Sequence, residues 1–120
     1  MSITDLEKLI EEEINKISQE ELVSTIQDHK VAIRVENREW DYSNTYKEYP
    51  CYIVLEDKKS NTAIAYCENG FGPAYPWGLL FIEGEYMSMG MDANWFCSLE
   101  EAVRDSKFWE GENPKGYEVN

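Results

Sequence analysis

The sequence predicts an α+β domain with a mainly antiparallel sheet of four to five strands, two N-terminal helices and one C-terminal helix. Two observations carry this prediction. Apolar residues repeat every three or four positions near both ends of the chain, as along one side of a helix, but alternate every second position from Val31 onwards. The strand-like segments then follow one another without an intervening helix, which is typical of antiparallel pairing.

The 120 residues form one domain, because a chain of this length has no room for two independent cores. We expect helices in residues 1–30, sheet and loops in 31–97, a helix in 98–109 and a loosely held tail in 110–120.

Two capping boxes predict the N-terminal helices. Thr4 and Glu7 place the start of the first helix near Asp5, and Ser18 and Glu21 place a second helix at about 19–28. A single helix bent at the second box is the alternative. The residues expected to face the core are Leu6, Leu9, Ile10, Ile14 and Ile17 in the first helix and Leu22, Val23 and Ile26 in the second.

The strands are read from alternation and turn composition. Val31, Ile33 and Val35 should face inward from a strand that runs toward Trp40, followed by a loop over residues 41–48. Residues 49–56 and 62–67 should form a hairpin around the polar turn 57–61. Residues 77–82 are apolar without alternation, as in a central strand covered on both faces, and 94–97 form a short edge strand.

The C-terminal helix is predicted by a third capping box, Ser98 and Glu101. It should run from 99 to about 108, and the residues expected to face the core are Leu99, Ala102, Val103 and Ser106.

Charge narrows the class of partner. The net charge is −13, and no Lys or Arg occurs between Lys59 and Arg104. Nucleic acid and anionic membranes are disfavoured as partners, because proteins bind both through clusters of Lys and Arg side chains. A basic protein or a divalent cation is favoured. The acidic N-terminus is not a signal peptide, and an odd set of cysteines, Cys51, Cys67 and Cys97, indicates buried thiols in a reducing cytoplasm.

No catalytic, metal or cofactor motif is present, so we expect a protein that is not an enzyme and holds no metal or cofactor. The single histidine, His29, falls at a predicted helix end, where histidine usually caps the helix. One histidine without a C-x-x-C pair does not make a zinc site, and the loop acids match no calcium loop.

Loop aromatics beside carboxylates are the candidate partner-binding residues. Such pairs resemble protein–protein hot spots, although aromatics that pin loops onto the sheet are the alternative. The candidates are Trp40, Asp41, Glu83, Glu85, Asp92 and Trp95.

This profile resembles the small acidic immunity proteins of bacterial toxin systems. The resemblance is carried by the compact acidic chain without a catalytic set, and by the segments PWGLLF and GMDANWF-SLEEA between Trp77 and Ala102. It implies tight binding to one cognate toxin, often a basic nuclease, but transfers no contact residues. The alternatives are a dimeric ligand-binding or assembly module and, third, a hydrolase that uses carboxylates.

Overall fold

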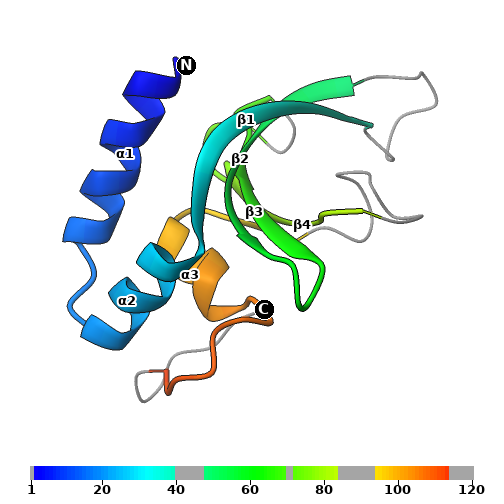
Figure 1. Ribbon diagram of the computed structural model, residues 1–120. Coiled ribbons are helices and arrows are strands. Elements are labelled where there is room, and N and C mark those ends of the chain that lie inside the picture. Colours follow the sequence, from blue (N-terminus) through cyan, green and yellow to red (C-terminus); the bar gives the residue numbers. More distant parts are fainter. Residues whose placement is uncertain (1, 40–47, 70–71, 84–93, 114–120) are drawn as a thin grey trace.

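The computed structural model describes residues 2–39, 48–69, 72–83 and 94–113, and these form an α+β fold. Three helices and a five-stranded sheet follow in the order α1 (Ile3–Asn15), α2 (Glu20–His29), β1 (Lys30–Glu39), β2 (Glu48–Asp57), β3 (Thr62–Tyr66), β4 (Trp77–Phe81), β5 (Asn94–Phe96) and α3 (Leu99–Arg104). The strands lie in sequence order, and every neighbouring pair is antiparallel. Figure 1 shows the three helices grouped on one side of the strongly curved sheet. The predicted fold class is therefore confirmed.

The main core lies between the helices and the sheet. The predicted stripe of α1 is buried at Leu6, Ile10 and Ile14, and α2 contributes Leu22 and Ile26. On the sheet, one cross-strand row on this face consists of Tyr52, Tyr66, Trp77 and Phe96. Aromatic rings thus supply much of the burial, as a domain of this size requires.

A second, smaller core lies on the opposite face of the sheet. It consists of the buried residues Cys51, Ile53, Ala63, Ala65, Cys67 and Leu80, with Trp95 packed against it. Gly78 makes room for Trp95, since a Cβ atom at Gly78 would lie 2.7 Å from the indole ring. Both faces of the central strands are therefore covered, as the unbroken apolar run of β4 predicts.

Two helix starts differ from the prediction. Ser2, not Thr4, caps α1, because its Oγ accepts the backbone N–H of Asp5 at 3.1 Å. The residue before α2 is Gln19, and no side chain caps this helix. The Gln19 amide instead donates to the Glu112 carbonyl and accepts from Arg104. The two helices are separate, so the bent single helix is wrong.

The C-terminal elements are shorter and better held than predicted. Ser98 caps α3 as expected, but the helix ends at Arg104 instead of near Phe108. The buried Arg104 guanidinium donates to Glu100, Asn113 and Gln19 at 2.9–3.0 Å. These bonds fix residues up to 113 against α2 and α3, so a loosely held tail is wrong for 110–113. Residues 114–120 lie outside the described part of the chain.

A bulge in β1 overturns one core assignment. Lys30 pairs with Leu55 and Arg34 with Ile53, so residues 31–33 lie opposite Val54 alone. Val31 and Ile33, both expected to face inward, therefore pack against opposite faces of the sheet, Val31 against the smaller core and Ile33 against the main core. Val35, also expected in the core, pairs with Tyr52 on the main-core face but is 48% exposed. The strand β2 also begins at Glu48, which the sequence placed in a loop.

Candidate functional site

Of the six predicted contact residues, the structure describes two. Trp40, Asp41, Glu85 and Asp92 lie outside the described residues. The side chain of Glu83 is exposed, and its backbone is fixed by two hydrogen bonds to the Asn61 side chain, at 2.8 and 3.1 Å. Trp95 is half-buried with its ring against Gly78, so much of the indole anchors β5 to the sheet.

Glu83 and Trp95 are not brought together. Trp95 pairs with Gly78 near the start of β4, whereas Glu83 follows the end of that strand. At about 3.3 Å per residue, the two positions are roughly 16 Å apart along the strand direction. For Trp95, packing therefore favours the alternative in which an aromatic residue pins its segment onto the sheet.

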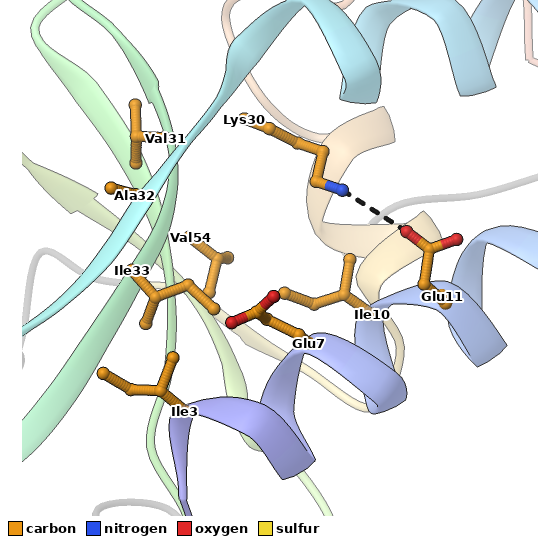
Figure 2. Close-up of a pocket in the computed structure, with 9 residues that line it drawn as sticks. All are labelled: Ile3, Glu7, Ile10, Glu11, Lys30, Val31, Ala32, Ile33 and Val54. Carbon is orange, nitrogen blue, oxygen red and sulfur yellow. Dashed lines mark hydrogen bonds and ion pairs between the residues drawn. The ribbon is translucent and has the colours of Figure 1, made fainter.

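A groove lies between α1 and β1, and most of its lining residues are apolar. Its volume is about 380 Å³. Figure 2 shows its lining, which α1, β1 and β2 supply. The lining residues are Ile3, Glu7, Ile10, Glu11, Lys30, Val31, Ala32, Ile33 and Val54.

The β1 bulge shapes this groove. Successive side chains of a regular strand point to opposite faces, yet the three consecutive residues 31–33 all line the hollow. The groove therefore lies along the irregular stretch of β1, and β1 has an unpaired edge because it is the terminal strand of the sheet that the structure describes.

Of the two carboxylates that line the groove, one forms an ion pair and the other does not. Glu11 accepts a hydrogen bond from Lys30 Nζ at 3.3 Å and forms an ion pair with it. The Glu7 carboxylate points toward the apolar side chains of Ile10 and Ile33 in Figure 2, and no ion pair to Glu7 occurs among the described residues. The Glu11 end of the groove is thus neutral, and the Glu7 end carries a negative charge.

The bases near β1 are neutralised within the fold. Arg34 donates to Glu36 at 2.8 Å and to Glu56 at 2.7 Å. Arg38, which is 2% exposed, donates to the same Glu36 at 2.7 Å, while its buried Nη1 has no hydrogen-bond partner in the described structure. Burial raises the pKa of Glu36, but hydrogen bonds from Arg38 and Arg34 outweigh it, so the net pKa is lowered. Glu36 is therefore a carboxylate at neutral pH.

The excess acid collects on the helical layer. α1 and α2 carry seven exposed carboxylates against one exposed lysine, Lys8, with the exposed Lys16 and Lys30 directly after their C-terminal ends. Figure 1 shows both helices on the same side of the sheet. The exposed acids are Asp5, Glu7, Glu11, Glu12, Glu20, Glu21 and Asp28. The strongest negative region among the described residues is therefore the helical layer, while most of the predicted acidic loops lie outside those residues.

A second hollow, of about 450 Å³, contains His29, Asp57 and Ser60, three residue types that also form hydrolase triads. In this hollow, the hydrogen bonds do not connect the three residues in the order Ser–His–Asp that catalysis requires. Ser60 Oγ donates to Asp57 at 2.6 Å, and this bond lowers the pKa of Asp57. His29 Nδ1 lies 2.7 Å from the Thr25 carbonyl oxygen, and Nε2 lies 3.9 Å from Asp57, beyond hydrogen-bond distance. The carboxylate thus holds the hydroxyl that an imidazole would have to activate.

The cysteines offer no activated thiolate. Cys51 and Cys67 are buried in the smaller core, and the contact with Cys67, together with burial, raises the pKa of the Cys51 thiol. Cys97 is exposed, which corrects the expectation that all three are buried. Partial desolvation and the Glu101 carboxylate raise the pKa of the Cys97 thiol, which makes it a poor nucleophile. Across the described residues, no three His, Cys, Asp or Glu side chains converge as a metal site.

Sequence reasoning missed the groove, because residues 3–11, 30–33 and 54 are distant in the chain. The available clue was Ile3, an apolar residue that lies before the predicted capping box, three residues ahead of Leu6. In the part of the chain that the structure describes, no helix is both long and apolar enough to span a membrane. No protein-family model, curated protein or solved structure matches this chain.

Proposed function

We propose that this chain is a non-catalytic binding protein that neutralises a basic partner in the cytoplasm, as immunity proteins neutralise toxins. The observation that carries the proposal is the uneven charge of the surface. Five of the described bases are held in ion pairs with carboxylates of the same chain: Lys16, Lys30, Arg34, Arg38 and Arg104. The exposed acids of α1 and α2 outnumber the bases beside them, and this leaves a strong net negative field.

Such a field favours fast association with a positively charged protein. Opposite potentials steer diffusional encounter, and they act mainly on the association rate. The same field repels nucleic acid and anionic lipid, so we propose neither as a partner. Neither a cofactor nor a metal is needed for this mode of action.

The test is to capture partners with the tagged full-length protein from its native cell, at low and at high salt. We expect one basic protein whose capture weakens as salt rises, and whose toxicity or enzymatic activity is abolished at an equimolar ratio. A double variant, Glu21→Gln with Asp28→Asn, should lower the association rate roughly two- to threefold at low salt and leave the dissociation rate unchanged. Capture of only neutral or acidic proteins, or binding indifferent to salt, would contradict the proposal.

The unpaired edge of β1 favours a second candidate, a homodimer that serves as an assembly module. Sedimentation of the isolated protein decides between the two. A dimer at micromolar concentration would favour the assembly module, whereas a monomer would leave the edge available to a different partner.

A further inference from the structure

We propose that the α1–β1 groove and the outer edge of β1 together bind one extended basic segment of the partner. The segment would pair as an added strand with β1 and place an apolar side chain in the groove, with a Lys or Arg beside Glu7. This inference rests on the proposed function and names the surface and the partner chemistry for it.

The first step of the argument is the location of exposed apolar surface. Among the described residues, the large hydrophobic side chains with most exposure are Ile3, Val35 and Tyr75. Ile3 lines the groove, and Val35 shares a strand face with the groove residue Ile33, two positions away. Two of the three therefore form a continuous strip from the groove along β1, and such a patch is typical of interaction sites.

The second step is the backbone. Residues 34–39 pair regularly with β2 on one side, and β1 ends the described sheet on the other. The outward-facing N–H and C=O groups of this stretch can therefore accept another strand, as in peptide recognition by β-strand addition. A strand added there would reach the groove at the bulge, where residues 31–33 line it and Ile33 points toward α1 in Figure 2.

The third step is charge complementarity, which selects the occupant. The bases beside this edge are occupied, since Lys30 is paired with Glu11, and Arg34 with Glu36 and Glu56. Glu7 remains as a carboxylate over the apolar floor, in a protein of net charge −13. A second copy of the chain would bring the same negative charge, so a basic segment fits this surface better than self-association.

The probe is a fluorescein-labelled nonapeptide of alternating Lys and Val residues, titrated with the full chain at 150 mM salt. Fluorescence anisotropy measures its binding. A control peptide of equal charge carries Pro at the Val positions, which removes the N–H donors that a strand needs. We expect the Lys–Val peptide to bind roughly tenfold or more tightly than the Pro peptide, and to protect amides of residues 32–39 from hydrogen exchange.

Two matched variants locate the site on α1. Glu7 lines the groove, whereas Glu12 is another exposed acid of the same helix, outside the lining. Glu7→Lys should weaken the Lys–Val peptide roughly tenfold, and Glu12→Lys less than about twofold, because salt screens charges beyond about 8 Å. Circular dichroism should show that both variants keep the fold.

The outcomes separate this inference from the proposed function. Equal binding of the two peptides, or equal weakening by the two variants, would overturn the groove inference and leave a protein that attracts bases by charge alone. No binding of either peptide would overturn the inference, and if capture also returns no basic protein, the proposed function falls with it. A concentration-dependent dimer that Glu7→Lys strengthens would instead assign the edge to a second copy.

Discussion

The two sides of α1 show how one helix can be closed against one neighbour and open toward another. Toward α3, the buried Glu13 accepts the backbone N–H of Leu99 at 2.9 Å and holds Lys16 at 3.1 Å. Toward β1, Glu7 lies over an apolar groove, and Ile3 is 43% exposed. On this helix, the role of a glutamate therefore depends on the groups that face its side chain, since Glu13 and Glu7 are the same residue type.

The closed side has a clear physical basis. The first N–H groups of a helix have no partner within it, and a carboxylate near the N-terminus is favoured by the helix dipole. Glu13 and Ser98 supply acceptors for two such groups of α3, those of Leu99 and Glu101. On the groove side, the structure describes no hydrogen bond from a backbone group to the Glu7 carboxylate, and the lining comes from α1, β1 and β2.

The largest contrast in stability should come from apolar truncation on the two sides. Leu6 is fully buried in the helix-side core, so Leu6→Ala should lower the free energy of unfolding by about 2–5 kcal/mol. Ile3→Ala removes a half-exposed side chain of the same class and should cost less than about 1 kcal/mol. Urea unfolding of both variants measures the difference. Equal costs would mean that the groove is closed in solution.

Removing a carboxylate should likewise destabilise the protein more on the α3 side of α1, at Glu13, than on the groove side, at Glu7. Glu13→Ala leaves the buried N–H of Leu99 without an acceptor and should cost about 1–3 kcal/mol, whereas Glu13→Gln keeps an acceptor oxygen and should cost less. Glu7→Ala should stay within about 0.5 kcal/mol of the unaltered protein. Thermal unfolding can rank the three. A Glu13→Ala variant as stable as Glu7→Ala would show that the α1–α3 bond contributes nothing.

Alkaline pH should destabilise the protein by ionising Tyr66, which is buried in the main core. Burial, followed by the hydrogen bond with Glu68, raises the pKa of Tyr66 from 10.0 to about 12. Because the folded-state pKa is raised, the stabilisation is fully present below pH 10 and is lost as pH rises through 12. Urea unfolding at pH 9 and pH 11.5 should show this loss, and Tyr66→Phe should reduce it. An unchanged pH dependence in that variant would exclude Tyr66 as its source.

The smallest effect should come from filling the open side. Ala32 is exposed and lines the groove, so Ala32→Val adds a β-branched residue at little steric cost. We expect stability to change by less than about 0.5 kcal/mol while the Lys–Val peptide binds several-fold more weakly. Unchanged peptide binding would show that the probe does not use the groove.

Local patterns predicted most of the elements and one side of each helix. The stripe that contains Leu6, Ile10 and Ile14 is buried as its spacing indicates, and Ser98 caps α3. The predictions were wrong where more than one nearby residue could begin the helix. Ser2 and Thr4 are both good capping residues, and only the chain geometry selects Ser2. Ser18 lost its expected role because α2 begins at Glu20, after an uncapped Gln19.

Features that depend on distant segments could not be predicted. The bulge that turns Val31 and Ile33 to opposite faces of the sheet is defined by the pairing of β1 with β2, and no residue within β1 marks it. The burial of Glu13, Arg38 and Arg104 likewise depends on partners elsewhere in the chain or on the sheet. The groove combines both kinds of information, so charge composition predicted the kind of partner but not the surface that we propose for it.

The bulge in β1 also limits how long a recognised motif can be. Among the described residues of β1, those at 34–39 offer a regular ladder beyond the bulge, so an incoming strand can match these six residues, about 20 Å. A longer uninterrupted edge would recruit unfolded chains indiscriminately and promote fibre growth. Under the proposed strand addition, the irregular stretch would restrict the bound segment to a short sequence and end its register there.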